Sequence, residues 1–138
     1  MPSLLVAISA IAGSSAATVS VSFDETYDNG SQSLATVSCS DGQNGLLTKG
    51  FTTFSSLPSF PNIGGAPAVG GWNSEACGTC WELTFNGTSI NVLAIDSGAS
   101  GFNIALGAMN KLTNGQAVAL GRVNANATQV NATACGLH

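Results

Sequence analysis

Charged side chains are scarce in this chain of 138 residues. Lys and Arg number 3, Asp and Glu number 7, and together they make up 7% of the sequence, against about 25% in a typical globular protein. Three cations cannot form the dense basic face that neutralises phosphates, so nucleic acid and anionic membrane are not expected partners. The surface must instead consist of Ser, Thr, Asn and Gly, which hydrogen-bond neutral polar partners such as extracellular polysaccharide. The alternative is that low charge simply reflects an acid-tolerant secreted protein.

Histidine is nearly absent, since the one copy is His138 at the end of the sequence. We expect this to be a poor position for orienting a general base, which excludes Ser-His-Asp and Cys-His catalysis. Glycoside hydrolysis usually needs two carboxyl groups held about 5 to 10 Å apart, and carboxylates are few. We therefore predict that the chain is not an enzyme and has no catalytic residues.

Long apolar runs are missing, and none in the sequence is long enough to cross a bilayer. Residues 4–12 form a short apolar run, and the small residues 13–17 follow it, with Ser15 and Ala17 suited to a signal-peptidase site. We predict that residues 1–17 are a removable secretion signal and that residues 18–138 form one extracellular domain. The alternative is that the run is an ordinary first strand or helix.

Cysteine is present in four copies, Cys39, Cys77, Cys80 and Cys135. An even number in a small exported protein predicts a disulfide framework. Cys77-Gly-Thr-Cys80 could also be a redox pair or half of a zinc site, but it leads into a strand pattern instead of opening a helix. We therefore expect structural disulfides, with no metal and no cofactor.

Period-2 alternation predicts several short strands. Val19–Phe23 alternates clearly, and Trp81–Phe85 and Ile90–Ile95 form a hairpin around the turn Asn86-Gly87. Because nearly every residue of Ile90–Ile95 is apolar, this strand should be buried on both faces. The other expected strands are 34–39, 116–123 and 128–134.

Helical signals are few. Apolar spacing predicts a helix within 102–112, with Asn103 as its N-cap, and a shorter helix within 46–57. Proline and glycine make 58–73 a loop. Many short strands with glycine turns and one clear helix indicate a small closed β-barrel.

Asp96 is the carboxylate best placed for a function. It ends the buried run 92–95 and begins the glycine loop 97–101, so we expect it at the mouth of a barrel strand, where it could accept hydrogen bonds from sugar hydroxyls. The alternative is an Asp that bonds its own loop backbone. The loop 41–45 is a second polar candidate, or only a turn, and Trp72 and Tyr27 could stack on sugar faces or lie in the core.

Four sequons for N-glycosylation occur, and each is a candidate glycan site on a secreted chain. The acceptor residues are Asn29, Asn86, Asn126 and Asn131. The motif is short and Asn and Thr are abundant, so the sequence alone does not predict occupancy.

Taken together, these segments resemble the cerato-platanin family of small secreted fungal proteins. The combination of Cys39-Ser-Asp-Gly-Gln-Asn-Gly-Leu46 with Cys77-Gly-Thr-Cys-Trp81 is specific, and the matches run in order along the chain. The other matching stretches are Val19-Ser-Val-Ser-Phe-Asp24 with Tyr27-Asp28, Ile63-Gly-Gly65, Gly71-Trp-Asn-Ser74, Val92–Asp96, Ala99-Ser-Gly-Phe-Asn-Ile104 and Cys135-Gly-Leu137.

The resemblance implies a mainly β fold, a six-stranded double-ψ β-barrel with one or two short helices that is related to the expansin barrel. It also implies the disulfides Cys39–Cys77 and Cys80–Cys135, binding of chitin-type N-acetylglucosamine oligomers, non-hydrolytic expansin-like loosening of polysaccharide, and recognition by plants as a defence elicitor. Asp96 stands where the family carries its barrel aspartate, which corresponds to an expansin active-site acid. The chain departs from the family pattern at Ser97-Gly98, which puts its binding preference in question.

We therefore predict a secreted carbohydrate-binding protein of the fungal cell wall or extracellular space. Its expected partners are chitin or N-acetylglucosamine oligomers, other cell-wall polysaccharides and a plant receptor, and we expect a monomer or weak self-association. The alternatives are a weak lytic or transglycosylase-type enzyme that uses Asp96, and a surface-active structural wall protein. The candidate carbohydrate-binding residues are Tyr27, Asp41, Asn44, Trp72, Asn73, Asp96, Gly101 and Asn103.

Overall fold

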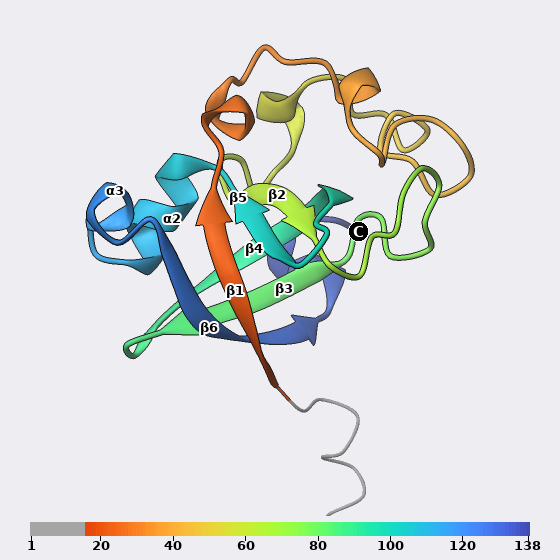
Figure 1. Ribbon diagram of the computed structural model, residues 1–138. Coiled ribbons are helices and arrows are strands. Elements are labelled where there is room, and N and C mark those ends of the chain that lie inside the picture. The colour runs from red at the N-terminus through yellow and green to blue at the C-terminus, as the bar shows by residue number, and fades with distance from the viewer. Residues whose placement is uncertain (1–15) are drawn as a thin grey trace, which may run out of the picture.

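The computed structural model describes residues 16–138, in which six strands close into a barrel (Figure 1). Around the barrel the strands follow the order β1-β5-β2-β4-β3-β6. The bounds are β1 Ala17–Phe23, β2 Ile63–Ala66, β3 Cys80–Phe85, β4 Thr88–Ser97, β5 Gly101–Ile104 and β6 Arg122–Val130. The prediction of a mainly β, six-stranded barrel is confirmed. The predicted signal peptide lies outside the described residues, apart from Ala16 and Ala17, and stays a prediction.

The barrel interior is filled by alternating side chains. In β6, Val123, Ala125 and Ala127 are buried while the residues between them are exposed. β4 differs because the four consecutive residues Val92–Ile95 are all buried. β4 pairs with β2 on one side and β3 on the other, and the 3₁₀ turn η5 (Ala132–Cys135) also contacts it. The expectation that this strand is buried on both faces is confirmed.

A long segment between β1 and β2 covers one end of the barrel (Figure 1, orange to yellow). It contains the 3₁₀ turns η2 (Glu25–Asp28), η3 (Leu34–Thr36) and η4 (Phe54–Ser56). Its apolar side chains form the upper part of the core and are fully or almost fully buried: Leu34, Leu46, Phe54 and Leu57. This layer matters for the site because it positions Tyr27 and Ser38 against the end of β4.

Two short α-helices follow β5. α2 (Leu106–Leu112) buries the apolar face that its spacing predicts, and α3 (Ala117–Leu120) is a single turn. The Asp28 carboxylate caps α2 from the covering layer, since its two oxygens accept from the backbone N–H groups of Leu106 at 2.7 Å and Gly107 at 2.8 Å. These N–H groups lack partners within the helix, so a distant carboxylate satisfies them.

One strand prediction was wrong, and two others hold only where they overlap β6. Residues 34–39 form no strand, because Ser33 caps the turn η3 and Ser38 donates its backbone N–H to the Asp96 carboxylate. In place of the two strands expected at 116–123 and 128–134 there are three elements. Residues 117–120 form α3, residues 122–130 form the single long strand β6, and residues 132–135 form the turn η5. The chain changes direction at Gly121, which has a φ of 71° that favours glycine.

Two further expectations need correction. The predicted loop 58–73 contains β2, and the predicted helix 102–112 is divided into β5 and α2, so that Asn103 is a strand residue and Ala105 precedes the helix. In both places pairing with distant strands overrides the local pattern, because β2 lies between β4 and β5. The shorter helix expected within 46–57 is present only as the 3₁₀ turn η4.

Two disulfides join the loops to the barrel, as the resemblance implies. Cys39 is bonded to Cys77 and Cys80 to Cys135, with Cα–Cα distances of 5.4 Å and 5.8 Å. The first connects the covering layer to the segment before β3, and the second connects β3 to η5. Within residues 16–138, no helix has the length and apolar character needed to span a membrane.

Candidate functional site

Cross-strand pairing places five residues side by side across the barrel wall. Arg122 of β6 is opposite Ser22 of β1, and Ser22 is opposite Asn103 of β5. Gly65 of β2 stands between Asn103 and Asp96 of β4. Adjacent strands lie about 4.8 Å apart, so Asp96 and Asn103 are separated by about 10 Å across a residue without a side chain. We call these five residues the Asp96 row.

A β-bulge decides which residue of β4 joins the row. Ile63 pairs with Leu93 and Gly64 with Ala94, but Gly65 pairs with Asp96 instead of Ile95. A bulge inserts one unpaired residue and redirects the side chains after it. Ile95 therefore stays fully buried, while Asp96 is half-buried near the end of β4.

The Asp96 carboxylate is held by three hydrogen bonds. Its Oδ2 accepts from the Tyr27 hydroxyl at 2.9 Å, and its Oδ1 accepts from the backbone N–H groups of Ser38 and Ser97, both at 3.0 Å. A carboxylate has about four acceptor positions, so one position on Oδ2 remains for a further donor. Asp96 therefore bonds its loop backbone, as the alternative interpretation has it, and the acceptance of hydrogen bonds from a sugar stays a prediction.

Tyr27 holds Asp96 and is not itself a sugar-stacking surface. Its side chain is only 7% exposed, and its ring is stacked on Phe54 with the centroids 6.0 Å apart. Burial, and secondarily the nearby Asp96 carboxylate, raises the pKa of the Tyr27 phenol well above its usual value. The hydroxyl therefore remains protonated and keeps donating to Asp96. Of the two alternatives that the sequence leaves open for Tyr27, the structure therefore shows the core position.

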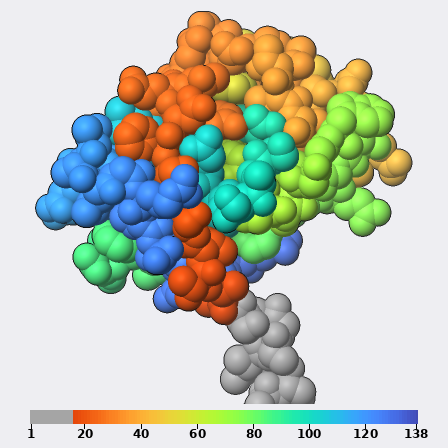
Figure 2. Space-filling model, in the orientation of Figure 1, coloured from red at the N-terminus to blue at the C-terminus, as the bar shows by residue number. Residues whose placement is uncertain are grey.

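An open groove lies beside the Asp96 row. Its volume is about 350 Å³, and it is lined by Ser22, Asn103 and Arg122 of the row together with residues 97–102. A second hollow of about 280 Å³ shares Ser97, Gly98 and Ala99 and extends to Pro67, Val69 and Gly70. Asp96 lines neither hollow, but its neighbour Ser97 lines both. Figure 2 shows the β4–β5 segment, in teal, at the centre of this face, between β1 in red and the green loop before β3.

Four of the predicted residues form a second group on neighbouring loops. The Trp72 indole N–H donates to Asp41 Oδ1 at 2.7 Å, and the Asn44 backbone N–H donates to Asn73 Oδ1 at 2.9 Å. The Asn44 side-chain amide also donates to the Asn73 carbonyl at 3.1 Å. Trp72 remains 62% exposed, so one face of a fixed indole is open to solvent. We call these four residues the Trp72 group.

The two groups are connected through residues 38–41. Ser38 donates to Asp96, and Asp41 accepts from Trp72 three residues later. Three residues span at most about 11 Å, so the two groups lie within the length of a short oligosaccharide. Gly101 and Asn103 belong to the Asp96 side, because Gly101 lines the groove through its backbone. The structure therefore brings together all eight predicted residues, with Tyr27 beneath the surface.

Sequence reasoning missed three residues of this surface. They are Ser22, Ser38 and Arg122. The serines resemble many others in the chain, but Arg122 had a signal, since it is one of only 3 basic residues. Its Nη1 donates to Ser20 Oγ at 3.0 Å, which holds the guanidinium beside the groove. Within residues 16–138, His, Cys, Asp and Glu side chains form no group of three that could hold a metal ion.

Comparisons with known proteins agree with this architecture. Residues 19–137 match the sequence model of the cerato-platanin family. The chain is 52% identical over 117 residues to Allergen Asp f 15 of Aspergillus fumigatus, covering 85% of this chain and 76% of that protein. It is also similar to the crystal structure of cerato-platanin 2 from M. perniciosa, with a TM-score of 0.84, 50% identity, and coverage of 88% of this chain and 100% of that one.

A solution structure described as that of the fungal elicitor Cerato-Platanin is similar as well. The TM-score is 0.75 and the identity 42%, over 85% of this chain and 96% of that one. The names of these relatives are those of an allergen and an elicitor, not of enzymes. With a family match across nearly all of the described residues and a shared barrel, this chain belongs to the cerato-platanin family.

Proposed function

We propose that this chain is a secreted carbohydrate-binding protein that binds chitin-type N-acetylglucosamine oligomers along the Asp96 row without hydrolysing them. The observation that carries the proposal is a carboxylate with one open acceptor position, fixed in a row with Asn103, Ser22 and Arg122 beside a groove. Secretion is supported by two disulfides, which persist in oxidising compartments.

The donors and acceptors of this surface fit a neutral sugar. Asp96 accepts from a hydroxyl or acetamido N–H, the Asn103 amide both donates and accepts, and the Arg122 guanidinium donates. Trp72 offers an exposed aromatic face on which the apolar side of a pyranose can stack. Because Asp41 fixes the indole, little side-chain freedom is lost when the sugar binds.

The same geometry favours binding over hydrolysis. Glycosidases usually place two carboxyl groups on opposite sides of the scissile bond. The hydrogen bonds of Asp96 among residues 16–138 come from a phenol and two backbone N–H groups, which fix the carboxylate as a hydrogen-bond acceptor. A weak lytic enzyme that uses Asp96 alone is the competing proposal. New chain ends in cell-wall polymers after long incubation, detected by mass spectrometry and lost in Asp96→Asn, would favour it.

We also propose expansin-like loosening of wall polysaccharide and activity as a plant defence elicitor. The relative described as a fungal elicitor supports the second activity by similarity. Both activities would follow from attachment to polysaccharide, which places the protein at the wall.

Isothermal titration with N-acetylglucosamine oligomers tests the binding proposal. We expect measurable heat at millimolar ligand for the wild type, and affinity roughly tenfold lower for Asp96→Asn, which corresponds to one charge-assisted hydrogen bond of about 1.5 kcal/mol. Glu82→Gln is a matched control that lies far from Asp96. Glu82 pairs with Asn91 of β4, and Asn91 is five residues and about 16 Å from Asp96 along that strand. Absence of heat in wild type and variant alike would refute the proposal.

A further inference from the structure

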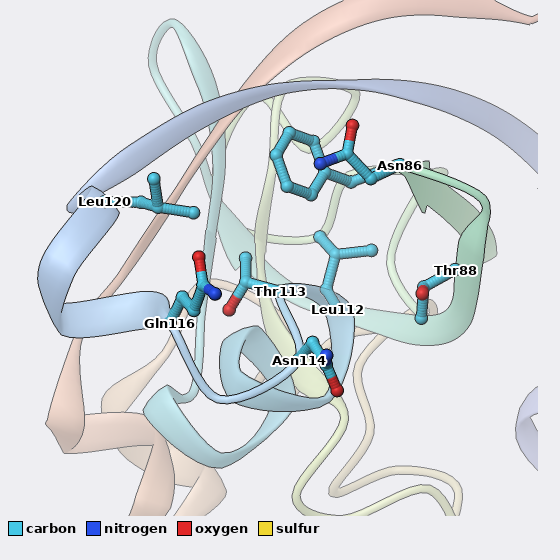
Figure 3. Close-up of a pocket in the computed structure, with 8 residues that line it drawn as sticks. Asn86, Thr88, Leu112, Thr113, Asn114, Gln116 and Leu120 are labelled. Atoms are coloured by element: carbon cyan, nitrogen blue, oxygen red, sulfur yellow. The ribbon is translucent and has the colours of Figure 1, made fainter.

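A pocket that shares no lining residue with the groove beside the Asp96 row has no part in the carbohydrate-binding surface. It lies between the β3–β4 turn and helices α2 and α3 and has a volume of about 370 Å³ (Figure 3). Its lining residues are Phe85, Asn86, Thr88, Leu112, Thr113, Asn114, Gln116 and Leu120. Figure 3 shows Asn86 on the turn and Leu120 on α3 at opposite sides of the pocket.

The turn that borders the pocket is a two-residue hairpin turn that carries a sequon. Asn86 and Gly87 have φ values of 48° and 81°, as a type I′ turn requires. Phe85 and Thr88 flank the turn as a cross-strand pair, so their side chains stand next to each other on one face. Asn86-Gly87-Thr88 thus places an aromatic ring, an acceptor asparagine and the sequon threonine around one pocket.

Asn86 differs from the other three sequon asparagines in its contacts. The side-chain oxygens of Asn29, Asn126 and Asn131 accept hydrogen bonds from Ser31, Thr18 and Thr133. For Asn86, the hydrogen bonds within residues 16–138 include none from its side chain, and the residue is exposed. Within residues 16–138 the amide nitrogens of Asn126 and Asn131 also donate no hydrogen bond, so Asn86 is set apart by its place at the rim of the pocket.

The pocket lining has the mixed character that an N-acetylglucosamine unit needs. Phe85 and Leu120 supply apolar surface for the C–H face of a pyranose, while the exposed Asn114 and Gln116 supply hydrogen-bonding groups. Leu120 is 42% exposed and Val118 is 72% exposed, and within residues 16–138 Trp72 is the one other exposed large apolar side chain. An exposed apolar patch of this kind favours a covering partner.

We propose that Asn86 is N-glycosylated and that its first N-acetylglucosamine lies in this pocket against Phe85. In the transfer, Asn86 Nδ2 attacks the anomeric carbon of an oligosaccharide carried on a polyprenyl diphosphate. The N–C bond forms, the bond between the anomeric carbon and the diphosphate oxygen breaks, the diphosphate leaves with the electron pair, and the proton that Nδ2 loses ends on the departing diphosphate. The transfer needs no oxidant or reductant, and it rests on export of the chain through the secretory pathway.

The first experiment tests attachment. The full chain is secreted from a yeast host, its glycans are released by peptide N-glycosidase in heavy-oxygen water, and peptides are mapped by mass spectrometry. We expect Asn86 to be converted to labelled Asp in the wild type. Thr88→Val keeps a β-branched side chain beside Phe85 but removes the sequon hydroxyl, so the label at residue 86 disappears.

Thr128→Val is the matched control for attachment. It removes the sequon of Asn126 on β6 in the same way, and the glycan at Asn86 should remain. An unmodified Asn86 in the secreted wild type overturns the proposal. Failure of the chain to leave the cell also overturns it, because attachment requires export.

The second experiment tests the position of the sugar. Trimming with an endoglycosidase leaves one N-acetylglucosamine on Asn86, and the same chain from a bacterial periplasm carries none. We expect upfield ring-current shifts of the sugar protons and a Tm about 2–5 °C above that of the glycan-free chain. Phe85→Val should keep the glycan and lose both effects. Attachment without ring-current shifts would overturn the placement in the pocket.

Discussion

At the scale of the residue, Asp96 combines two tasks that usually belong to different side chains. Its Oδ1 accepts two backbone N–H groups and fixes the loops on either side, and its Oδ2 faces Tyr27 and retains an open position. Replacement by Ala would leave those N–H groups without a partner, and such loss costs about 1–3 kcal/mol for a buried group. Asn keeps one oxygen for the backbone and removes the charge, which makes Asp96→Asn the sharper test of binding.

The chain contains a single tyrosine, so the titration of Tyr27 can be measured directly. Its pKa is raised by burial and by the Asp96 carboxylate, whereas an unfolded tyrosine has a pKa of about 10. Above that pH the unfolded chain loses the proton and the folded chain keeps it. We therefore expect stability to be unaffected below about pH 9 and to fall above pH 10 by about 1.4 kcal/mol per pH unit.

Urea unfolding and tyrosinate absorbance between pH 8 and about pH 11 check this prediction. Tyr27→Phe should remove the alkaline decline, because the variant has no phenol to titrate. It should also be less stable at neutral pH by about 1–2 kcal/mol, since Asp96 loses a hydrogen-bond donor. A tyrosinate signal that rises near pH 10 in the folded protein would contradict the burial argument.

At the scale of the element, the bulge between β2 and β4 sets the position of Asp96. A Cβ on Gly65 would lie 2.4 Å from the Ser97 carbonyl oxygen, which is backbone and cannot move aside easily. We expect Gly65→Ala to cost about 2–3 kcal/mol and to weaken oligosaccharide binding, because β4 must shift away from β2. Urea unfolding and isothermal titration measure the two effects.

Gly70→Ala is the control, since no atom lies within 4 Å of a Cβ at that position. Its stability should stay within about 0.5 kcal/mol of the wild type. Equal behaviour of the two variants would mean that the close approach at Gly65 does not position Asp96.

Elements with their own periodicity could be predicted from the sequence, and elements made by tertiary pairing could not. Trp81–Phe85 and its hairpin partner were identified because alternation and the Asn86-Gly87 turn agree. β2 escaped detection because Ile63–Ala66 has no alternation and contains two glycines, which are needed only because neighbouring backbones approach closely. Asn103 was assigned to a helix because a helical pattern begins just beyond it.

The same distinction applies to the candidate site. Asp96 was found from its place at the end of a buried run, and Trp72 from its residue type. Ser22 and Arg122 reach the site through the register of β1 with β5 and β6, which no local pattern contains. The eight predicted residues came from the resemblance and from residue chemistry, whereas the Asp96 row, which contains Asp96 and Asn103 of them, follows from the barrel topology.

At the scale of the whole molecule, two disulfides stabilise a small domain with little charge. They join residues 38 and 55 positions apart, and the chain-entropy model gives about 4 kcal/mol for each. The whole net stability of a typical domain is about 5–15 kcal/mol, so either bridge is a large share of it. The two bridges differ in position. Cys39 of the first lies between Ser38 and Ser40, close to both parts of the candidate surface, whereas the second joins β3 to η5.

This difference in position predicts a separation of stability from binding. Replacing Cys39 and Cys77 by Ser should cost about as much stability as replacing Cys80 and Cys135, since the two loops are of similar length. Only the first pair ties residues 38–41 to the loop that follows Trp72. Its loss frees the Asp96 row and the Trp72 group to move relative to each other, so the ligand must order them on binding.

We expect roughly tenfold weaker binding of N-acetylglucosamine oligomers by the Cys39→Ser/Cys77→Ser variant and unchanged binding by the Cys80→Ser/Cys135→Ser variant. Isothermal titration measures the two affinities at a low temperature, where circular dichroism shows both variants folded. An equal loss of affinity in the two variants would show that the bridges act on stability alone.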